Sequence, residues 1–188
     1  YALAACLPGS ELMLRGLSEH SSQGDSILHL WMQGFGILNK FSTEGCAISS
    51  VSRQPDFFRA DMRNQPDLIP TLVSLCAKKR IDFDIIGSGN LQYKESKRDE
   101  ALQAELAKTG AILELGADSI SSRPYESFPD SEIRLLSYED HRMDMSWMVQ
   151  ALNRPNVWIE KPGVTVKSYP GFWMDLERMG FVFESSLI

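Results

Sequence analysis

The chain has 188 residues, enough for one sizeable hydrophobic core. Hydrophobic residues make up 43% of it and charged residues 23%, as is usual for a globular domain, and no apolar run approaches the roughly 20 residues that cross a bilayer. The formal net charge of −6 argues against nonspecific nucleic-acid binding, which needs clustered positive charge. We therefore expect neither a membrane nor a nucleic acid as partner, although a small local basic site is compatible with this charge.

The cysteines and histidines form no metal-binding pattern. The sequence has no CxxC motif and its cysteines are widely spaced, so we expect reduced thiols in a cytoplasmic protein. The histidines are too scattered to predict a metal triad. The residues concerned are Cys6, Cys46, Cys76, His20, His29 and His141.

The first predicted element is the end of a helix. Residues 2–7 are mostly apolar and helix-forming, and Pro8 and Gly9 then end the helix. The chain has no starting methionine, and no capping residue precedes this helix. We therefore expect residues 1–188 to be a single domain that is truncated at its N-terminus.

Helices and strands alternate along the rest of the chain. Apolar residues recur at helical spacing in the longer segments, and short apolar runs bounded by turn residues predict the strands. Ser96 is expected to cap the third of these helices. In chain order the elements are a helix at 25–33, a hairpin of strands 37–41 and 47–51, a helix at 66–79, a strand at 81–86, a helix at 96–108, a hairpin of strands 112–115 and 119–122, a strand at 133–136, a helix at 141–152, a strand at 157–160 and a helix at 171–179.

One pattern recurs about every 70 residues: a helix ends near a glycine and a strand-like segment follows. The three instances are residues 33–38, 109–114 and 179–184. We therefore expect an α/β (α+β) domain with internal three-fold repetition, and no second domain within these residues.

Polar residues gather at four loop-to-helix junctions, where a ligand could approach helix N-termini. The clusters are at residues 64–67, 90–98, 138–143 and 166–171. Each has a plain structural interpretation: Asp67 complements a helix dipole, Lys94 and Glu95 form a surface pair, and Asp140 caps a helix. Together, their carboxylates, lysines and arginines suit an anionic ligand and acid–base chemistry.

At these residues the sequence resembles the EPSP synthase (3-phosphoshikimate 1-carboxyvinyltransferase) family. The Asp-His-Arg-Met motif at 140–143 and the Lys-Ser-Tyr-Pro motif at 167–170 are highly specific together. The other matching segments are residues 22–25, 66–71 and 94–98, and all five occur in the family's order. The resemblance spans essentially the whole chain and is to the C-terminal half of the family's two-domain enzymes.

The resemblance implies a fold and a reaction. Each domain of the family is an inside-out α/β barrel-like structure of three repeated βαβαββ units, and the active site lies between the two domains. There the enolpyruvyl group of phosphoenolpyruvate (PEP) is transferred to the 5-hydroxyl of shikimate 3-phosphate and phosphate is released, a step in aromatic amino-acid biosynthesis. Neither a metal nor an organic cofactor is needed. The implied partners are the two substrates and the missing N-terminal domain.

The resemblance also implies roles for eight residues. Asp67 is the expected base for the reacting hydroxyl, and Glu95 is expected to move a proton at the methylene carbon of PEP. The expected substrate-binding residues are Asn90 and Lys94 for shikimate 3-phosphate and Arg98, Arg142 and Lys167 for PEP, with His141 in a supporting role. Arginine suits the task because its planar fork binds phosphate and carboxylate in a bidentate manner.

One motif position and two alternatives stay open. The family's usual motif is Lys-Glu-Thr-Asp-Arg, whereas this chain has Lys-Glu-Ser-Lys-Arg at 94–98. Lys97 could repel Arg98, or it could point outward and form an alternative anion contact. The alternatives are a related transfer to UDP-N-acetylglucosamine, which the motifs disfavour, and a non-catalytic substrate-binding fragment, which the missing half favours for the isolated chain.

Overall fold

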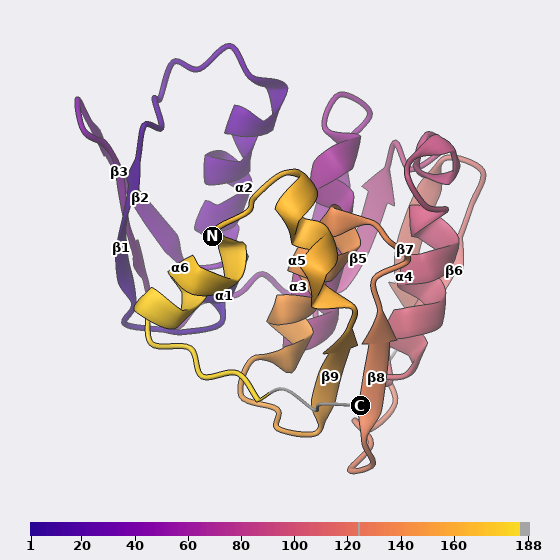
Figure 1. Cartoon of the computed structure of the whole chain (residues 1–188). Helices are drawn as coiled ribbons and strands as arrows, with labels where there is room; N and C mark the ends of the chain where they lie inside the picture. The colour runs from indigo at the N-terminus through magenta and orange to yellow at the C-terminus, as the bar shows by residue number, and fades with distance from the viewer. Residues whose placement is uncertain (124, 185–188) are drawn as a thin grey trace.

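Three separate sheets surround a group of inner helices (Figure 1). The computed structural model describes residues 1–123 and 125–184. The first sheet is antiparallel with the order β1-β3-β2, and the second has the order β4-β5-β7-β6. The third sheet is the parallel pair β8-β9. The strands are β1 (Glu11–Arg15), β2 (Ile37–Ser42), β3 (Gly45–Ser50), β4 (Phe57–Asp61), β5 (Asp82–Ile86), β6 (Ile112–Leu115), β7 (Ser119–Arg123), β8 (Ile133–Leu136) and β9 (Val157–Glu160).

The helices fall into an inner and an outer set. The inner helices α1 (Ala2–Ala5), α3 (Ile69–Lys79) and α5 (His141–Ala151) contact one another between the sheets. The outer helices are α2 (Leu28–Gly34), α4 (Arg98–Ala107) and α6 (Phe172–Arg178). Short 3-10 turns complete the set: η1 (Gly24–Ile27), η2 (Pro66–Leu68), η3 (Leu91–Tyr93) and η4 (Pro162–Lys167). None of these helices is both long and apolar enough to cross a membrane.

The order of elements repeats along the chain. The segment β4-α3-β5-α4-β6-β7 is one complete βαβαββ unit, with β4 and β5 parallel and β6 and β7 antiparallel. The preceding β1-α2-β2-β3 has the order and pairing of the last four elements of that unit. The following β8-α5-β9-α6 repeats its first four elements. The predicted α/β class with internal repeats is therefore confirmed, with one complete and two partial units among the residues described.

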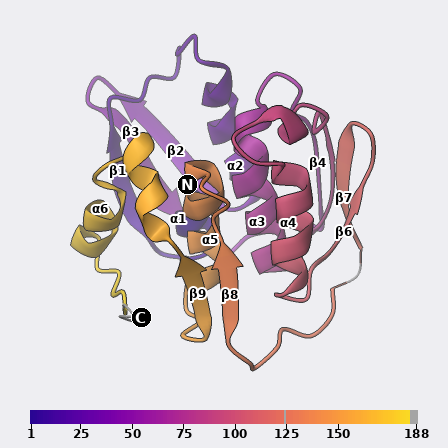
Figure 2. The same cartoon turned by 45° about the vertical axis from the view of Figure 1, so that its right-hand side comes forward.

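The inner position of three helices gives the fold its inside-out character. Most side chains of α3 and α5 are buried, because each helix is covered by the other and by the surrounding sheets (Figure 2). Ser74 donates to the Ser146 carbonyl at 2.9 Å between the two helices. Lys78 and Lys79 donate to the last carbonyls of α5 and α1, respectively, at the C-terminal ends of those helices. Across the described residues the sheets stay separate, and they do not close into a barrel.

Most predicted elements are present with small shifts. Both predicted hairpins are confirmed, with Ile37 opposite Ser50 and Ile112 opposite Arg123. The predicted strand at 179–184 is wrong. Gly180 has φ of 94°, as a helix end requires, but residues 181–184 form no strand. In the complete unit the equivalent strand, β6, pairs with β7, and no such partner exists for 181–184 in the described part of the chain.

Candidate active site

The N-terminal ends of α3, α4 and α5 meet at one shallow pocket of about 320 Å³. Because helix N-termini carry partial positive charge and free N–H groups, this end of the inner helices favours an anion. The pocket is lined by Asp67, Tyr93, Lys94, Glu95, Arg98, His141 and Arg142. Six of the eight site residues predicted from the sequence are therefore brought together, although they come from three separate parts of the chain.

Asp140 starts α5 and anchors the site. Its Oδ1 accepts from the Arg142 amide at 3.0 Å, the bond of a helix N-cap. Just before it, Tyr138 and Glu139 have φ of 55° and 58°. A left-handed backbone costs a side chain with a Cβ about 1–2 kcal/mol, so contacts from the surroundings must hold this turn. After the turn, Asp140 is buried beside Arg98, and His141 and Arg142 line the pocket.

Arg98 is the buried centre of the polar network, with its side chain only 2% exposed. Its Nε and Nη2 donate to the two oxygens of Asp140 at 2.7 and 3.2 Å. Its Nη1 donates to Asp67 at 2.8 Å and its Nη2 to Glu95 at 3.3 Å. Burial alone would raise the pKa of Asp140, but the hydrogen bonds and charge of Arg98 outweigh it, so the pKa is lowered.

The predicted capping role of Ser96 is wrong. Helix α4 begins at Arg98 with Lys97 in the cap position, and the Ser96 hydroxyl donates instead to Oδ2 of Asp140 at 3.0 Å. Because α4 starts two residues later than predicted, Ser96 lies before the cap position, and its hydroxyl donates to the buried carboxylate, which is a strong acceptor. Ser96 therefore supports the anchor of α5 rather than the start of α4.

Asp67 is surrounded by three cations, which we call the cation cluster: Lys94, Arg98 and Arg142. Their distances to the Asp67 oxygens are 3.2, 2.8 and 3.1 Å. Burial raises the pKa of Asp67, but Arg142, Lys94 and Arg98 together lower it below its ordinary value. Without a ligand, Asp67 is thus the anion that neutralises the cluster, and in that state it is a poor base.

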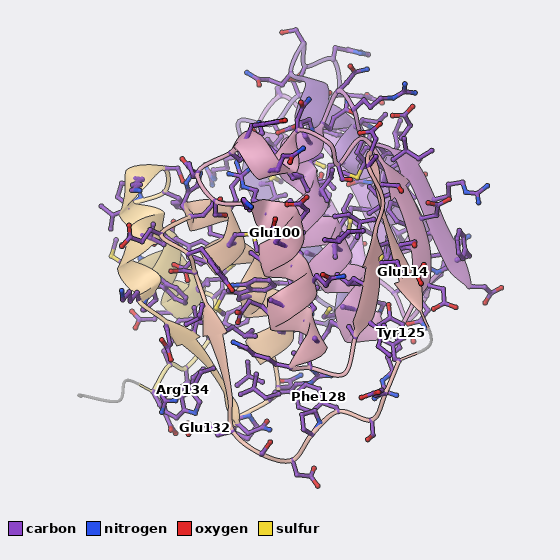
Figure 3. All side chains as sticks on the ribbon, turned by 90° about the vertical axis from the view of Figure 1, so that its right-hand side faces the viewer. Glu100, Glu114, Tyr125, Phe128, Glu132 and Arg134 are labelled. Atoms are coloured by element: carbon purple, nitrogen blue, oxygen red, sulfur yellow. The ribbon has the colours of Figure 1, made fainter. Side chains whose placement is uncertain are left out.

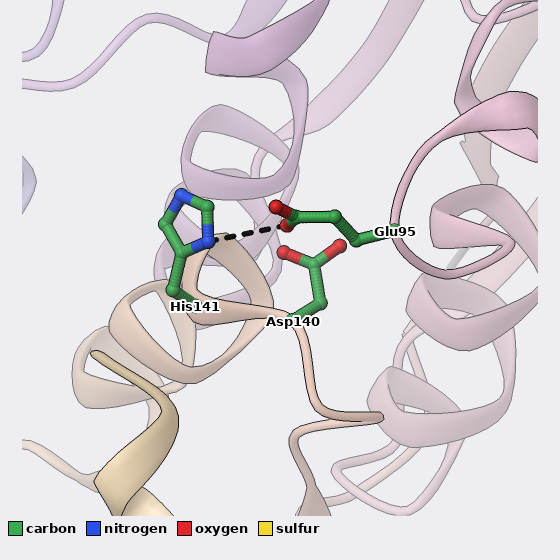
Figure 4. Close-up of side chains that lie close together, drawn as sticks. All are labelled: Glu95, Asp140 and His141. Atoms are coloured by element: carbon green, nitrogen blue, oxygen red, sulfur yellow. Dashed lines mark ion pairs between the residues drawn. The ribbon is translucent and has the colours of Figure 1, made fainter. Parts of the chain in front are cut away.

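Glu95 and His141 form the other side of the pocket. The Nδ1 of His141 lies 3.1 Å from Oε2 of Glu95 (Figure 4). With Asp140 they offer three ligand atoms within 4.8 Å of one another, a spacing that could hold a metal ion. However, the oxygens of Asp140 already accept bonds from Arg98, Ser96 and the Arg142 amide, so the Arg98 guanidinium occupies the place that a cation would need.

Two predicted site residues do not line the pocket. Lys167 is exposed, and its Nζ donates to the Glu139 carbonyl at 3.2 Å, directly beside Asp140. Asn90 is exposed at the start of η3. Conversely, Tyr93 lines the pocket and Asp140 anchors it, although the sequence assigned neither a functional role. The signals in the sequence were the place of Asp140 in the Asp-His-Arg-Met motif and at a helix cap, and the place of Tyr93 in the polar cluster at 90–98.

Lys97 points away from the pocket. Its Nζ lies 2.9 Å from Glu100 Oε1, and both side chains are more than 60% exposed, at 64% and 62%. Figure 3 shows Glu100 on the outer side of α4. Of the two interpretations of Lys97, the outward orientation is therefore the one observed. The Lys97 ammonium forms an ion pair with Glu100.

The fold is a repeat α/β domain, and a pocket that contains Lys94, Arg98 and Arg142 lies at the N-terminal ends of α3, α4 and α5. Two solved structures of EPSP synthase from Acinetobacter baumannii share this fold, with TM-scores of 0.70 and 0.64 and sequence identities of 19% and 18%, each covering 99% of this chain and 45% of the other. The family model for EPSP synthase (3-phosphoshikimate 1-carboxyvinyltransferase) matches residues 1–176. The chain belongs to the EPSP synthase family.

Curated relatives agree with this assignment. A 3-phosphoshikimate 1-carboxyvinyltransferase of Bacteroides fragilis is 35% identical over 182 residues, which is 96% of this chain and 44% of the relative. One of Methanosphaerula palustris is 31% identical over 182 residues, covering 97% and 42%. The chain therefore spans less than half the length of the relatives that it matches.

Proposed function

We propose that residues 1–188 are the C-terminal domain of an EPSP synthase and supply one wall of its active site. The reaction is transfer of the enolpyruvyl group of PEP to the 5-hydroxyl of shikimate 3-phosphate, with release of phosphate, in cytoplasmic aromatic amino-acid biosynthesis. The observation that carries the proposal is the convergence of Lys94, Arg98 and Arg142 on Asp67. A substrate phosphate or carboxylate can take the place of Asp67 on these cations.

The cation cluster suits PEP, which carries several negative charges. Arg98 and Arg142 offer planar forks for phosphate and carboxylate oxygens, and the N-termini of two 11-residue helices, α3 and α5, add to the positive potential. The same groups would stabilise the charge that moves to the departing phosphate. Lys167 would join them by leaving the Glu139 carbonyl, while Lys94 and Asn90 would bind shikimate 3-phosphate.

Asp67 and Glu95 would carry the proton transfers. When PEP binds Arg98 and Arg142 and shikimate 3-phosphate binds Lys94, the pKa of Asp67 rises, so that Asp67 can accept the proton of the 5-hydroxyl. The hydroxyl oxygen then bonds to C2 of PEP while Glu95, whose Oε2 lies 3.1 Å from His141 Nδ1, protonates C3, which gives a tetrahedral intermediate. The bond from C2 to the phosphate oxygen breaks next, and C3 returns its proton to Glu95, leaving the enol ether and free phosphate.

The opposite wall would come from the N-terminal domain of the full-length protein. The pocket is shallow and half-open, with Asp67 30% and Glu95 45% exposed, whereas catalysis of this kind needs both substrates held in place and water excluded. We therefore expect the 188-residue chain alone to bind ligand weakly at most and not to turn over.

The test is phosphate release from PEP by the full-length protein, offered either shikimate 3-phosphate or UDP-N-acetylglucosamine. We expect release with shikimate 3-phosphate only. Release with the UDP-sugar instead would reassign the substrate, and no release with either acceptor would refute the proposed activity. Turnover by the isolated 188-residue chain would show that the second wall is not required.

A further inference from the structure

The turn at Tyr138 and Glu139, just before α5, must be stabilised by contacts with other elements. Tyr138 and Glu139 are two successive non-glycine residues in the left-handed region, with φ of 55° and 58°. Side chains with a Cβ avoid this region, so such a turn persists only where the surrounding structure fixes it. The turn is followed at once by Asp140, the carboxylate that binds Arg98.

Glu105 of α4 stabilises the turn through two hydrogen bonds. It is 1% exposed, and its Oε1 accepts from the Tyr138 hydroxyl at 2.8 Å. Its Oε2 accepts from the Leu136 amide at 3.0 Å. On the opposite side Trp147 donates to the Leu136 carbonyl at 2.9 Å. The end of β8 is therefore fixed by both α4 and α5 just before the strained turn.

Helix α4 also holds the far side of the turn. Arg98 and Glu105 are seven residues apart, about two helical turns, so they share one face of α4. Arg98 binds Asp140 after the turn, and Glu105 binds Leu136 and Tyr138 before and within it. The Glu139 carbonyl, between these two attachments, accepts from Lys167.

We propose that Glu105 and Tyr138 are positioning residues. They fix the place of the Arg98–Asp140 pair, and so the position in which Arg98 meets PEP. Neither side chain lines the pocket, so they act through the turn. Loss of the Tyr138–Glu105 hydrogen bond would let the turn relax, and Asp140 and the Glu139 carbonyl would shift together. The kinetic consequence rests on the proposed function, whereas the structural one does not.

A matched pair of variants tests this in the full-length protein. Tyr138→Phe removes the hydroxyl that holds the turn. Tyr125→Phe removes a hydroxyl that donates at the same 2.8 Å to the Ile81 carbonyl. Tyr125 and Arg134 of β8 lie on opposite sides of α4 in Figure 3, so the control leaves the turn untouched.

We expect Tyr138→Phe to raise the KM for PEP roughly three- to tenfold, less than the hundredfold that a full 1 Å misplacement causes. The KM for shikimate 3-phosphate should change less than twofold, and Tyr125→Phe should change neither. A general loss of stability would not separate the two substrates. Equal KM values for PEP in Tyr138→Phe and Tyr125→Phe would overturn the proposal.

A second readout is independent of turnover. In NMR spectra of the full-length protein labelled with ¹⁵N-arginine, we expect the Arg98 Nε–H to exchange slowly, because it donates to buried Asp140. We expect roughly tenfold faster exchange in Tyr138→Phe and in Glu105→Gln, but not in Tyr125→Phe. Unchanged exchange in the first two variants would refute the positioning role. If the wild-type protein releases no phosphate, the proposed function fails, and this measurement still decides the role of Glu105 and Tyr138.

Discussion

Arg98 and Asp140 form a bidentate ion pair that is almost wholly buried, with side chains 2% and 0% exposed. Removal of one partner from such a pair leaves a buried charge unanswered, which typically costs about 3–5 kcal/mol. We therefore expect Asp140→Ala to lower the free energy of unfolding by about 3 kcal/mol, measured by urea denaturation.

The control for that variant is Arg178→Ala, which breaks the exposed pair of Arg178 with Asp175. Exposed pairs contribute little, so we expect a change below about 1 kcal/mol. Equal losses in the two variants would mean that burial of the Arg98–Asp140 pair has no special effect on stability.

Asp144 gives the protein a specific pH dependence. It is fully buried in α5, and within the described residues neither of its oxygens has a hydrogen-bond partner. Burial raises its pKa from 3.8 to about 7. Because the folded state holds the proton more tightly than the unfolded state, stability falls as pH rises from about 4 to about 7 and then levels off.

Asp144→Asn should remove this dependence. We expect the variant to match the wild type at pH 4.5 and to be more stable by about 2 kcal/mol at pH 8, where the wild type buries a charge. Urea unfolding at the two pH values measures the difference. A wild type that gains stability relative to the variant between pH 4.5 and pH 8 would contradict the expected protonation of Asp144.

Lys97 should have little influence on PEP. It points outward to Glu100, so Lys97→Asp places a new carboxylate beside Glu100 and away from the cation cluster. We expect the KM for PEP in the full-length protein to change less than twofold. Stability should change little, because repulsion between the new carboxylate and Glu100 is offset by the favourable place of a carboxylate at the N-cap of α4. A marked drop in PEP affinity would mean that Lys97 reaches the ligand in the closed protein.

Glu95→Gln separates proton transfer from binding. The amide keeps the size of the side chain but cannot carry the proton to C3 of PEP. We expect kcat to fall roughly 10²- to 10⁴-fold in steady-state assays of the full-length protein, with a KM for PEP within a few-fold of the wild type. Parallel losses in kcat and affinity would assign Glu95 a binding role only.

Local patterns predicted much of the fold. The sequence signal for the β2–β3 hairpin was Thr43-Glu44-Gly45 between two short strand-like runs; in the structure Thr43 and Glu44 form the turn and Gly45 begins β3. Strand β4 was missed because two adjacent phenylalanines, Phe57 and Phe58, hide the alternation, although only Phe58 is buried. Strand β1 was missed for a similar reason, since charged Glu11 and Arg15 end a run of only three apolar residues.

The contacts between residues of different helices at the site could not be predicted from the sequence. The motifs identified Lys94, Arg98 and Arg142, but their convergence on Asp67 depends on how α3, α4 and α5 pack against one another. Ser96 had a strong local signal for a helix cap, and a carboxylate 44 positions away took its hydroxyl instead. Long-range contacts of this kind leave no local pattern, so Glu105 and Tyr138 were also missed.

We propose that Asp67 is both the base for the 5-hydroxyl and the anion whose place on Arg98 and Arg142 PEP takes. The most direct test is Asp67→Asn in the full-length protein, with steady-state phosphate release measured against PEP concentration. We expect a kcat at least about 10²-fold lower, with a KM for PEP equal to or below that of the wild type, because the freed cations gain affinity for the substrate. A KM for PEP that rises in step with the loss of kcat would contradict it.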